Sequence, residues 1–100
     1  LAPVQAMLIP ISDEQNEYAQ KIALELQNAG VRVEIDDTNE RMNAKIARAT
    51  SQKIPYMLVL GKKEVQEGVC AVRHRTEGDL GVMAVEEFAQ KIKNEMPAAQ

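Results

Sequence analysis

Two arginines, Arg73 and Arg75, flank His74 in a stretch that is typical of a β-strand. Residues two apart on a strand share one face, so both guanidinium groups are expected on the same side of a sheet. Lys62 and Lys63 lie in the connection just before this segment. Arginine can bind the edge of a nucleobase through two hydrogen bonds and can stack on an unpaired base. These residues therefore predict a basic surface suited to nucleic acid.

A surplus of positive charge covers residues 41–75. This segment has eight basic residues against two acidic ones, whereas the rest of the chain has four basic and thirteen acidic residues. The net charge of −3 hides this division. Attraction to phosphate is screened beyond about 8–10 Å, so the local charge matters more than the total. On charge alone, a solvated basic face and a surface for a polyanion are equally open.

Glu64 is an acidic residue within this basic stretch. A carboxylate opposes phosphate binding unless it accepts hydrogen bonds from a base, such as the amino and imino protons of guanine. The alternative is an ion pair with Lys62 or Lys63 at the rim of the surface. The residues by themselves favour the ion pair.

Residues for catalysis do not converge in the sequence, although a nucleophile beside a base, or paired carboxylates, would be needed. His74, the single histidine, lies between two arginines, which disfavours cation binding. The single cysteine, Cys70, excludes an internal disulfide and is expected in the core. Asp36 and Asp37 could hold a magnesium ion, but a solvated turn is favoured. We therefore predict no catalytic residue and no metal site.

The strands that must position these residues are indicated by apolar patterns. Nearly continuous apolar runs at 4–9 and 56–60 predict strands buried on both faces, and alternation at 31–35 predicts a strand with one wetter face. Residues 69–75 suit a strand that places Cys70, Val72 and His74 on the face opposite Arg73. A turn at 76–79 and a short edge strand at 80–83 are expected to follow. Residues 62–68 predict a polar connection or a single helical turn.

Three helices are expected between these strands. The first has a capping-box pattern at Ser12 and Gln15 and stops at Gly30. The second carries a thin apolar stripe of Met42, Ile46 and Ala49, with Thr38 or Asn39 as its cap and Ile54-Pro55 as its end. The third spans Val85 to Met96 and stops at Pro97. The order β-α-β-α-β-β-β-α predicts an α/β fold with a mixed, mostly parallel five-stranded sheet and three helices.

The chain has 100 residues, of which 45% are hydrophobic, and this size and composition fit one domain spanning residues 1–100. No apolar run approaches the ~20 residues of a membrane span, and no signal peptide is apparent. A single thiol fits a reducing compartment, so a cytoplasmic protein is expected. The start at Leu1, without an initiating Met, suggests a fragment of a longer protein.

Several motifs, taken together, resemble the C-terminal anticodon-binding domain of threonyl-tRNA synthetases, which are class II aminoacyl-tRNA synthetases. They are the entry Leu1-Ala2-Pro3-Val4-Gln5, the join Ala29-Gly30-Val31-Arg32-Val33, the strand Lys53-Ile54-Pro55-Tyr56-Met57-Leu58-Val59, and the ending Val72-Arg73-His74-Arg75 with Gly78-Asp79-Leu80-Gly81. The match spans the whole chain with consistent spacing. Synthetases for proline, glycine and histidine share the fold, but the ending favours threonine.

The resemblance implies a domain that grips the anticodon loop of tRNA(Thr). Asn39, Glu64 and Arg73 match family residues that contact anticodon bases, and Lys45 and Arg75 match basic residues near the RNA. For Glu64 the resemblance reverses the preference, because it implies that the carboxylate reads a guanine.

The resemblance also concerns the rest of the parent enzyme. It implies a ligase that joins threonine to tRNA(Thr), uses ATP, Mg²⁺ and a zinc ion in its catalytic domain, and dimerises through that domain. No cofactor is implied for this domain. The alternative is a stand-alone or accessory domain that binds another protein.

Two positions on the second helix depart from the family, and the loop near Glu77 is less basic than is usual there. An aromatic residue and an arginine are usual where this chain has Ala44 and Ala47. Arg48 follows the missing arginine, but it would point about 100° away around a helix. Backbone affinity or the path of the RNA is therefore expected to differ.

Overall fold

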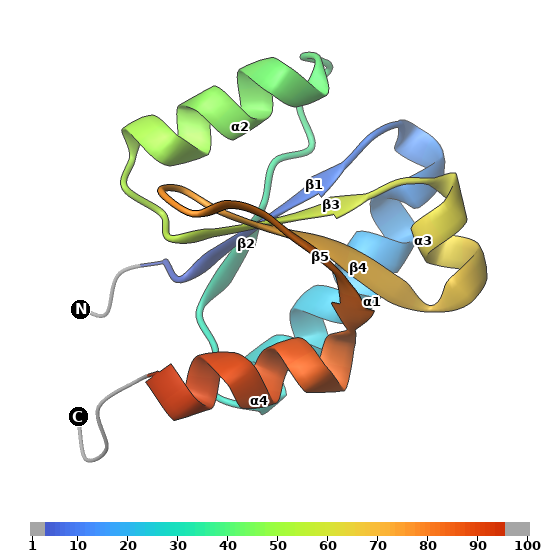
Figure 1. Cartoon of the computed structure of the whole chain (residues 1–100). Helices are drawn as coiled ribbons and strands as arrows, with labels where there is room; N and C mark the ends of the chain where they lie inside the picture. The colour runs from blue at the N-terminus through green and yellow to red at the C-terminus, as the bar shows by residue number, and fades with distance from the viewer. Residues whose placement is uncertain (1–3, 96–100) are drawn as a thin grey trace.

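Five strands form one sheet with helices on both faces (Figure 1). The computed structural model describes residues 4–95, so the predicted stop at Pro97 and the motif residues Leu1-Ala2-Pro3 lie outside it. The strands are β1 (Ala6–Pro10), β2 (Val33–Ile35), β3 (Tyr56–Leu60), β4 (Val69–His74) and β5 (Gly78–Ala84). The helices are η1 (Asp13–Gln15), a 3-10 turn, then α1 (Asn16–Asn28), α2 (Met42–Ser51), α3 (Lys62–Glu67) and α4 (Val85–Glu95). The α/β fold with a five-stranded mixed sheet is confirmed.

The strand order β2-β1-β3-β4-β5 determines where the helices lie. β1 pairs in parallel with both β2 and β3, whereas β3–β4 and β4–β5 are antiparallel, so the pairings divide evenly. The chain moves from β1 to β2 in one direction and then past β1 to β3 in the other. Because crossovers between parallel strands are right-handed, these opposite moves place α1 and α2 on opposite faces. Figure 1 shows α2 alone on one face and α1 with α4 on the other.

Alternating residues of the sheet supply two apolar cores. The larger core joins Leu8, Leu58 and Val72 to α1 and α4, with Phe88 fully buried. The smaller core joins Met7, Ile9 and Met57 to Ala49 of α2 and to Ile54. The period of two along β1 and β3 therefore assigns each strand residue to one layer.

The first helix follows its sequence signals. The side chain of Gln15 accepts hydrogen bonds from the Ser12 backbone N–H at 3.0 Å and from the Ser12 hydroxyl at 2.7 Å, which confirms the capping pattern. Gly30 has φ of 90°, and the following N–H, of Val31, bonds to the Leu26 carbonyl at 2.9 Å. A residue without Cβ adopts this left-handed conformation at little cost, so the chain turns sharply into β2.

Several details differ from the predicted elements. The cap of α2 is Arg41 instead of Thr38 or Asn39, and the helix stops before Lys53, which has φ of 64°. The polar connection forms the short helix α3, and β5 begins two residues earlier than predicted. In β5 the register passes from Gly81 opposite Val72 to Asp79 opposite Arg73, so one residue bulges between them. Within residues 4–95, no helix is long and apolar enough to cross a membrane.

Candidate nucleic-acid interface

Asn39 lies on the loop between β2 and α2, and this loop is anchored by Asp36. The Asp36 carboxylate accepts hydrogen bonds from the Thr38 backbone N–H at 3.2 Å and from the Thr38 hydroxyl at 2.8 Å. Its other oxygen pairs with the Arg48 guanidinium group at 3.1 Å. Asp36 is buried, whereas Asn39 is exposed. The anchoring therefore leaves the Asn39 amide at the surface on a constrained segment.

Arg48 extends from α2 to this loop and forms ion pairs with Asp36 and with Glu40. Both carboxylates lie on the β2–α2 loop, so the guanidinium charge is balanced within the fold. Arg48 therefore does not replace the arginine that the family usually has at the position of Ala47. Ala47 and Ala44 are both exposed on α2.

Lys45 is buried beneath the same loop, with 3% of its surface exposed. Its ammonium group donates hydrogen bonds of 3.1 Å to the carbonyl of Pro10, at the end of β1, and to the carbonyl of Asp36, just after β2. A buried ammonium group must be hydrogen-bonded, and these two acceptors provide that stabilisation. Lys45 is expected near the RNA, and in the structure its side chain links α2 to the ends of β1 and β2.

Glu64 is the third residue of α3, where its Oε1 accepts a 2.8 Å hydrogen bond from the Gly61 backbone N–H. This bond caps the helix. No ion pair joins Glu64 to Lys62 or Lys63 in the part of the chain that the structure describes. The cap engages Oε1, which leaves Oε2 of this half-buried side chain for another donor.

Arg73 is half-buried on β4, where it lies opposite Met57. Residues paired across two strands share a face, so Arg73 lies on the face that carries α2. Arg75 is exposed beyond the end of the strand, and its backbone N–H bonds to the Pro55 carbonyl at 3.0 Å. His74 packs edge-on against Tyr56 in the other layer, at 5.0 Å between ring centroids. The predicted alternation of β4 is confirmed.

The five predicted residues lie in two groups. Asn39 and Lys45 line a pocket of about 230 Å³ at the carboxyl ends of β1 and β2, and Glu64 follows the carboxyl end of β3. Arg73 lies toward the opposite end of β3. At about 3.3 Å per residue, the three residues from Met57 to Leu60 separate the two ends by roughly 10 Å. A ligand that contacts both groups must therefore span roughly 10 Å.

A strip of sheet runs across the strands between the two groups; it is buried at β3 and accessible at β4 and β5. Val59, Ala71 and Val82 lie side by side across β3, β4 and β5 on the α2 face. Val82 is 57% exposed, and Ala71 is half-buried. The strip could not be predicted from the sequence, because only the register shows that the three residues are neighbours. It offers an apolar floor on which flat bases can lie.

The basic segment contributes less free charge than its composition indicates. Two of its eight basic residues, Lys45 and Arg48, use their charged groups to bind carbonyl or carboxylate oxygens within the protein. The others are exposed or half-buried: Arg41, Lys53, Lys62, Lys63, Arg73 and Arg75. These six basic groups, which lie on or next to α2, α3 and β4, favour the binding of phosphates.

Cys70 and Asp36, the sequence's candidates for a reactive thiol and for metal binding, are both buried in the fold. Cys70 is fully buried, and burial is the main cause that raises the pKa of its thiol to about 12, so the reactive thiolate is suppressed. Asp36 is engaged by Thr38 and Arg48. Across residues 4–95, no three His, Cys, Asp or Glu side chains gather in a group that could hold a metal ion.

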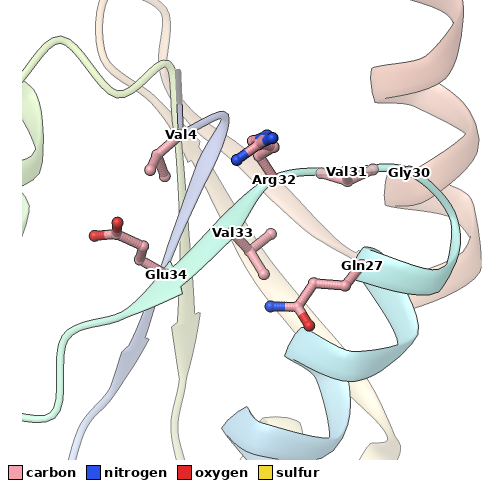
Figure 2. Close-up of a pocket in the computed structure, with 7 residues that line it drawn as sticks. All are labelled: Val4, Gln27, Gly30, Val31, Arg32, Val33 and Glu34. Atoms are coloured by element: carbon pink, nitrogen blue, oxygen red, sulfur yellow. The ribbon is translucent and has the colours of Figure 1, made fainter. Parts of the chain in front are cut away.

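A second pocket, of about 390 Å³, lies at the β2 edge of the sheet. Figure 2 shows its walls, which come from Val4, the end of α1, the connection at residues 30–32 and the start of β2. It contains none of the five predicted residues, and the charged groups that line it are Arg32 and Glu34 alone. We therefore place the candidate interface on the α2 face.

Comparison with known proteins identifies related chains. The profile of a family described as the anticodon binding domain matches residues 5–95. The chain is 52% identical over 98 residues to the threonine–tRNA ligase of Clostridium botulinum strain Okra, covering 98% of this chain and 15% of the relative. It is 47% identical over 96 residues to the threonine–tRNA ligase of Desulforamulus reducens, again with 15% of the relative covered. The chain thus spans about one seventh of the length of these relatives.

Solved structures show the same arrangement of elements. The RNA binding domain of threonyl-tRNA synthetase from Cryptosporidium parvum superposes with a TM-score of 0.86 at 27% identity, covering 93% of this chain and 24% of the other. Histidyl-tRNA synthetase from Nostoc superposes with a TM-score of 0.88 at 20% identity, covering 96% and 23%. The second likeness concerns the fold alone.

Proposed function

The chain belongs to the anticodon binding domain family, and we propose that it is the part of a threonyl-tRNA synthetase that binds the anticodon loop of tRNA(Thr). The observation that carries the proposal is the 52% identity to a threonine–tRNA ligase over 98% of the chain. The α2 face supports it, because exposed basic residues lie near an apolar strip of sheet that is accessible at Ala71 and Val82.

Glu64 and Arg73 are proposed to read bases. Every threonine anticodon has a guanine at its middle position, and guanine offers imino and amino protons to a carboxylate and two acceptors to a guanidinium group. The Oε2 atom of Glu64 and the half-buried guanidinium group of Arg73 meet these needs from two sides of the strip. Asn39 adds an exposed amide that can donate to and accept from a third group.

Backbone contacts are proposed for the exposed cations. Arg75, Lys62 and Lys63 lie at the two ends of the strip and are exposed. Contacts of this kind fix the register of RNA on the protein and make binding depend on salt.

Ligation itself is proposed for the remainder of the parent protein. The ligase family implies ATP use, and the chain covers 15% of the relatives' length. We therefore propose that the parent protein activates threonine, holds Mg²⁺ and zinc ions in its catalytic domain and dimerises through that domain. The present chain would supply selection of the tRNA.

A second candidate function is binding to another protein. The observation that favours it is the acidic character of the face opposite α2, where Glu17 and Glu25 of α1 and Glu86 and Glu87 of α4 are exposed. Such a face repels RNA and suits a basic protein partner. RNA binding on one face and protein binding on the other are compatible.

One titration tests the main proposal. The chain is titrated at low salt with an anticodon stem-loop of tRNA(Thr) and with the same stem-loop carrying adenine in place of the middle guanine. We expect saturable binding to the first and weaker binding to the second by at least about fivefold, since one good base contact contributes about 1–3 kcal/mol of discrimination. Equal affinity for both RNAs, or no binding, would contradict anticodon recognition and favour the protein-binding function.

A further inference from the structure

On the basis of the proposed function, we infer that Lys45 is a positioning residue for Asn39. It fixes the β2–α2 loop from below, and its ammonium group does not itself bind a phosphate. A positioning lysine contacts the protein itself, whereas a phosphate-binding lysine leaves its ammonium group accessible to RNA.

The contacts of Lys45 are internal and come from two different strands. Its Nζ lies 3.1 Å from the Pro10 carbonyl, which ends β1, and 3.1 Å from the Asp36 carbonyl, which begins the loop. The lysine is only 3% exposed, and the pocket that it lines also has the carboxylates of Asp13, Asp37 and Glu40 in its walls, which repel a phosphate. A lysine in this setting links backbone segments, because its three N–H donors can bond to carbonyls from different parts of the chain.

Asn39 lies between two residues that are themselves bound. Thr38, before it, donates to the Asp36 carboxylate at 2.8 Å, and Glu40, after it, pairs with Arg48. Arg48 also binds Asp36. The exposed amide of Asn39 is therefore carried by a segment fixed on both sides.

Lys45 and Arg48 act on this segment from one helix. They are three residues apart on α2 and so lie on the same side of it. Lys45 binds the backbone of Asp36, and Arg48 binds its side chain. Loss of either contact frees one end of the loop, and a misplaced amide loses base discrimination before it loses all affinity.

A direct contact between Lys45 and phosphate makes a different prediction. A lost phosphate contact weakens all RNAs alike and lowers the slope of log K against log salt by about 0.7 for a single strand. A lost positioning contact leaves the slope unchanged and reduces discrimination at the base that Asn39 reads.

The test uses the 100-residue chain and the variants N39A, K45M, R48Q and the double variant K45M/N39A. Stem-loops altered at each anticodon position first show which base loses discrimination in N39A. We expect K45M to discriminate about tenfold less well at that same base, with an unchanged salt slope. The double variant should lose little more discrimination than N39A alone. K21M is the matched control, because it removes an exposed lysine from α1 on the opposite face.

Circular dichroism and thermal unfolding establish that each variant is folded. If K45M does not fold, R48Q tests the same anchoring at a half-exposed residue and is expected to lose discrimination at the same base. A lower salt slope with equal losses for all RNAs would overturn the inference in favour of a phosphate contact. Wild-type discrimination in folded K45M and R48Q would overturn it as well. Failure of the wild-type chain to discriminate is a separate result, which removes the proposed function and the inference with it.

Discussion

Arg73 on β4 lies directly opposite Met57 on β3, and this pairing places the arginine on the face of the sheet that carries α2. Met57 is buried beneath α2, whereas Arg73 lies at the margin of the same layer and is half-buried. A side chain on a paired strand is held more closely than one on a loop. Arg75, two residues later, lies beyond the end of the strand and is exposed.

This difference predicts separate effects for the two arginines. Arg73→Ala should cost about 1–3 kcal/mol in binding the cognate stem-loop and relax the choice of base. Arg75→Ala should weaken cognate and altered stem-loops equally and reduce the salt slope by about 0.7. Fluorescence anisotropy at several salt concentrations measures both quantities. Identical behaviour of the two variants would show that strand position does not determine the role.

Glu64 is predicted to have two separable roles. Glu64→Gln keeps an Oε1 acceptor for the Gly61 N–H, so α3 should remain capped and the melting temperature close to that of the wild type. The amide has lost one acceptor and the charge, so discrimination for guanine should fall. Glu64→Ala should lose discrimination and also about 1 kcal/mol of stability. Thermal denaturation and stem-loop binding distinguish these outcomes, and wild-type discrimination in the Gln variant would rule out guanine reading by Glu64.

Ala47→Arg is predicted to strengthen RNA binding. The position is exposed on α2, so the substitution should change the free energy of unfolding by less than about 0.5 kcal/mol. Arg48 is occupied by Asp36 and Glu40, so a new arginine would add a charge that the fold does not neutralise. Affinity for all stem-loops should rise together, and the salt slope should increase by about 0.7. Ala47→Glu, as the control, should lower affinity; no change in either variant would place the RNA away from this side of α2.

Cys70 predicts how stability depends on alkaline pH. Burial raises the pKa of its thiol in the folded chain from 9.0 to about 12. The contribution of a group with a raised pKa is fully present below its unfolded value and is lost as the pH rises toward the folded value. The free energy of unfolding should therefore decrease from about pH 9 upward. Burial also raises the pKa values of Tyr18 and Tyr56, which adds to the decrease at higher pH.

Urea unfolding between pH 7 and pH 11 measures this decrease. Cys70→Ala should be less stable at pH 7 because it leaves a small cavity, but it should lack the part of the decrease that begins near pH 9. A thiol reagent should react with the native chain only as fast as the chain unfolds. Rapid reaction of the folded protein would show that Cys70 is accessible.

The sequence predicted those elements whose ends carry clear signals. β3 lies at Tyr56–Leu60, as predicted, because a proline precedes its apolar run and Gly61 follows it. α1 follows its capping box and stops at Gly30 for similar local reasons. β5 begins earlier than predicted because Gly78 and Asp79, typical turn residues, are held in the ladder by pairing with β4. Partners distant in sequence override local preference there.

The arrangement of the candidate interface could be predicted only in part. The residue types indicated a basic surface, and the alternation in β4 correctly separated Arg73 from Val72. The burial of Lys45 could not be predicted, because its acceptors are carbonyls at the ends of β1 and β2 that only the folded chain brings together. The stripe on α2 is likewise displaced: Met42 is 38% exposed, while Lys45 occupies the buried position.

The bulge in β5 has a consequence for how separate copies of the chain behave. β2 and β5 are the outer strands of the sheet, and outer strands can pair with another molecule and start aggregation. β2 offers only three residues, and the break in register between Gly81 and Asp79 interrupts β5. Neither border presents a long regular row of free amides and carbonyls to a neighbour. The same irregularity that shapes the margin of the candidate interface thus favours colloidal stability at high concentration.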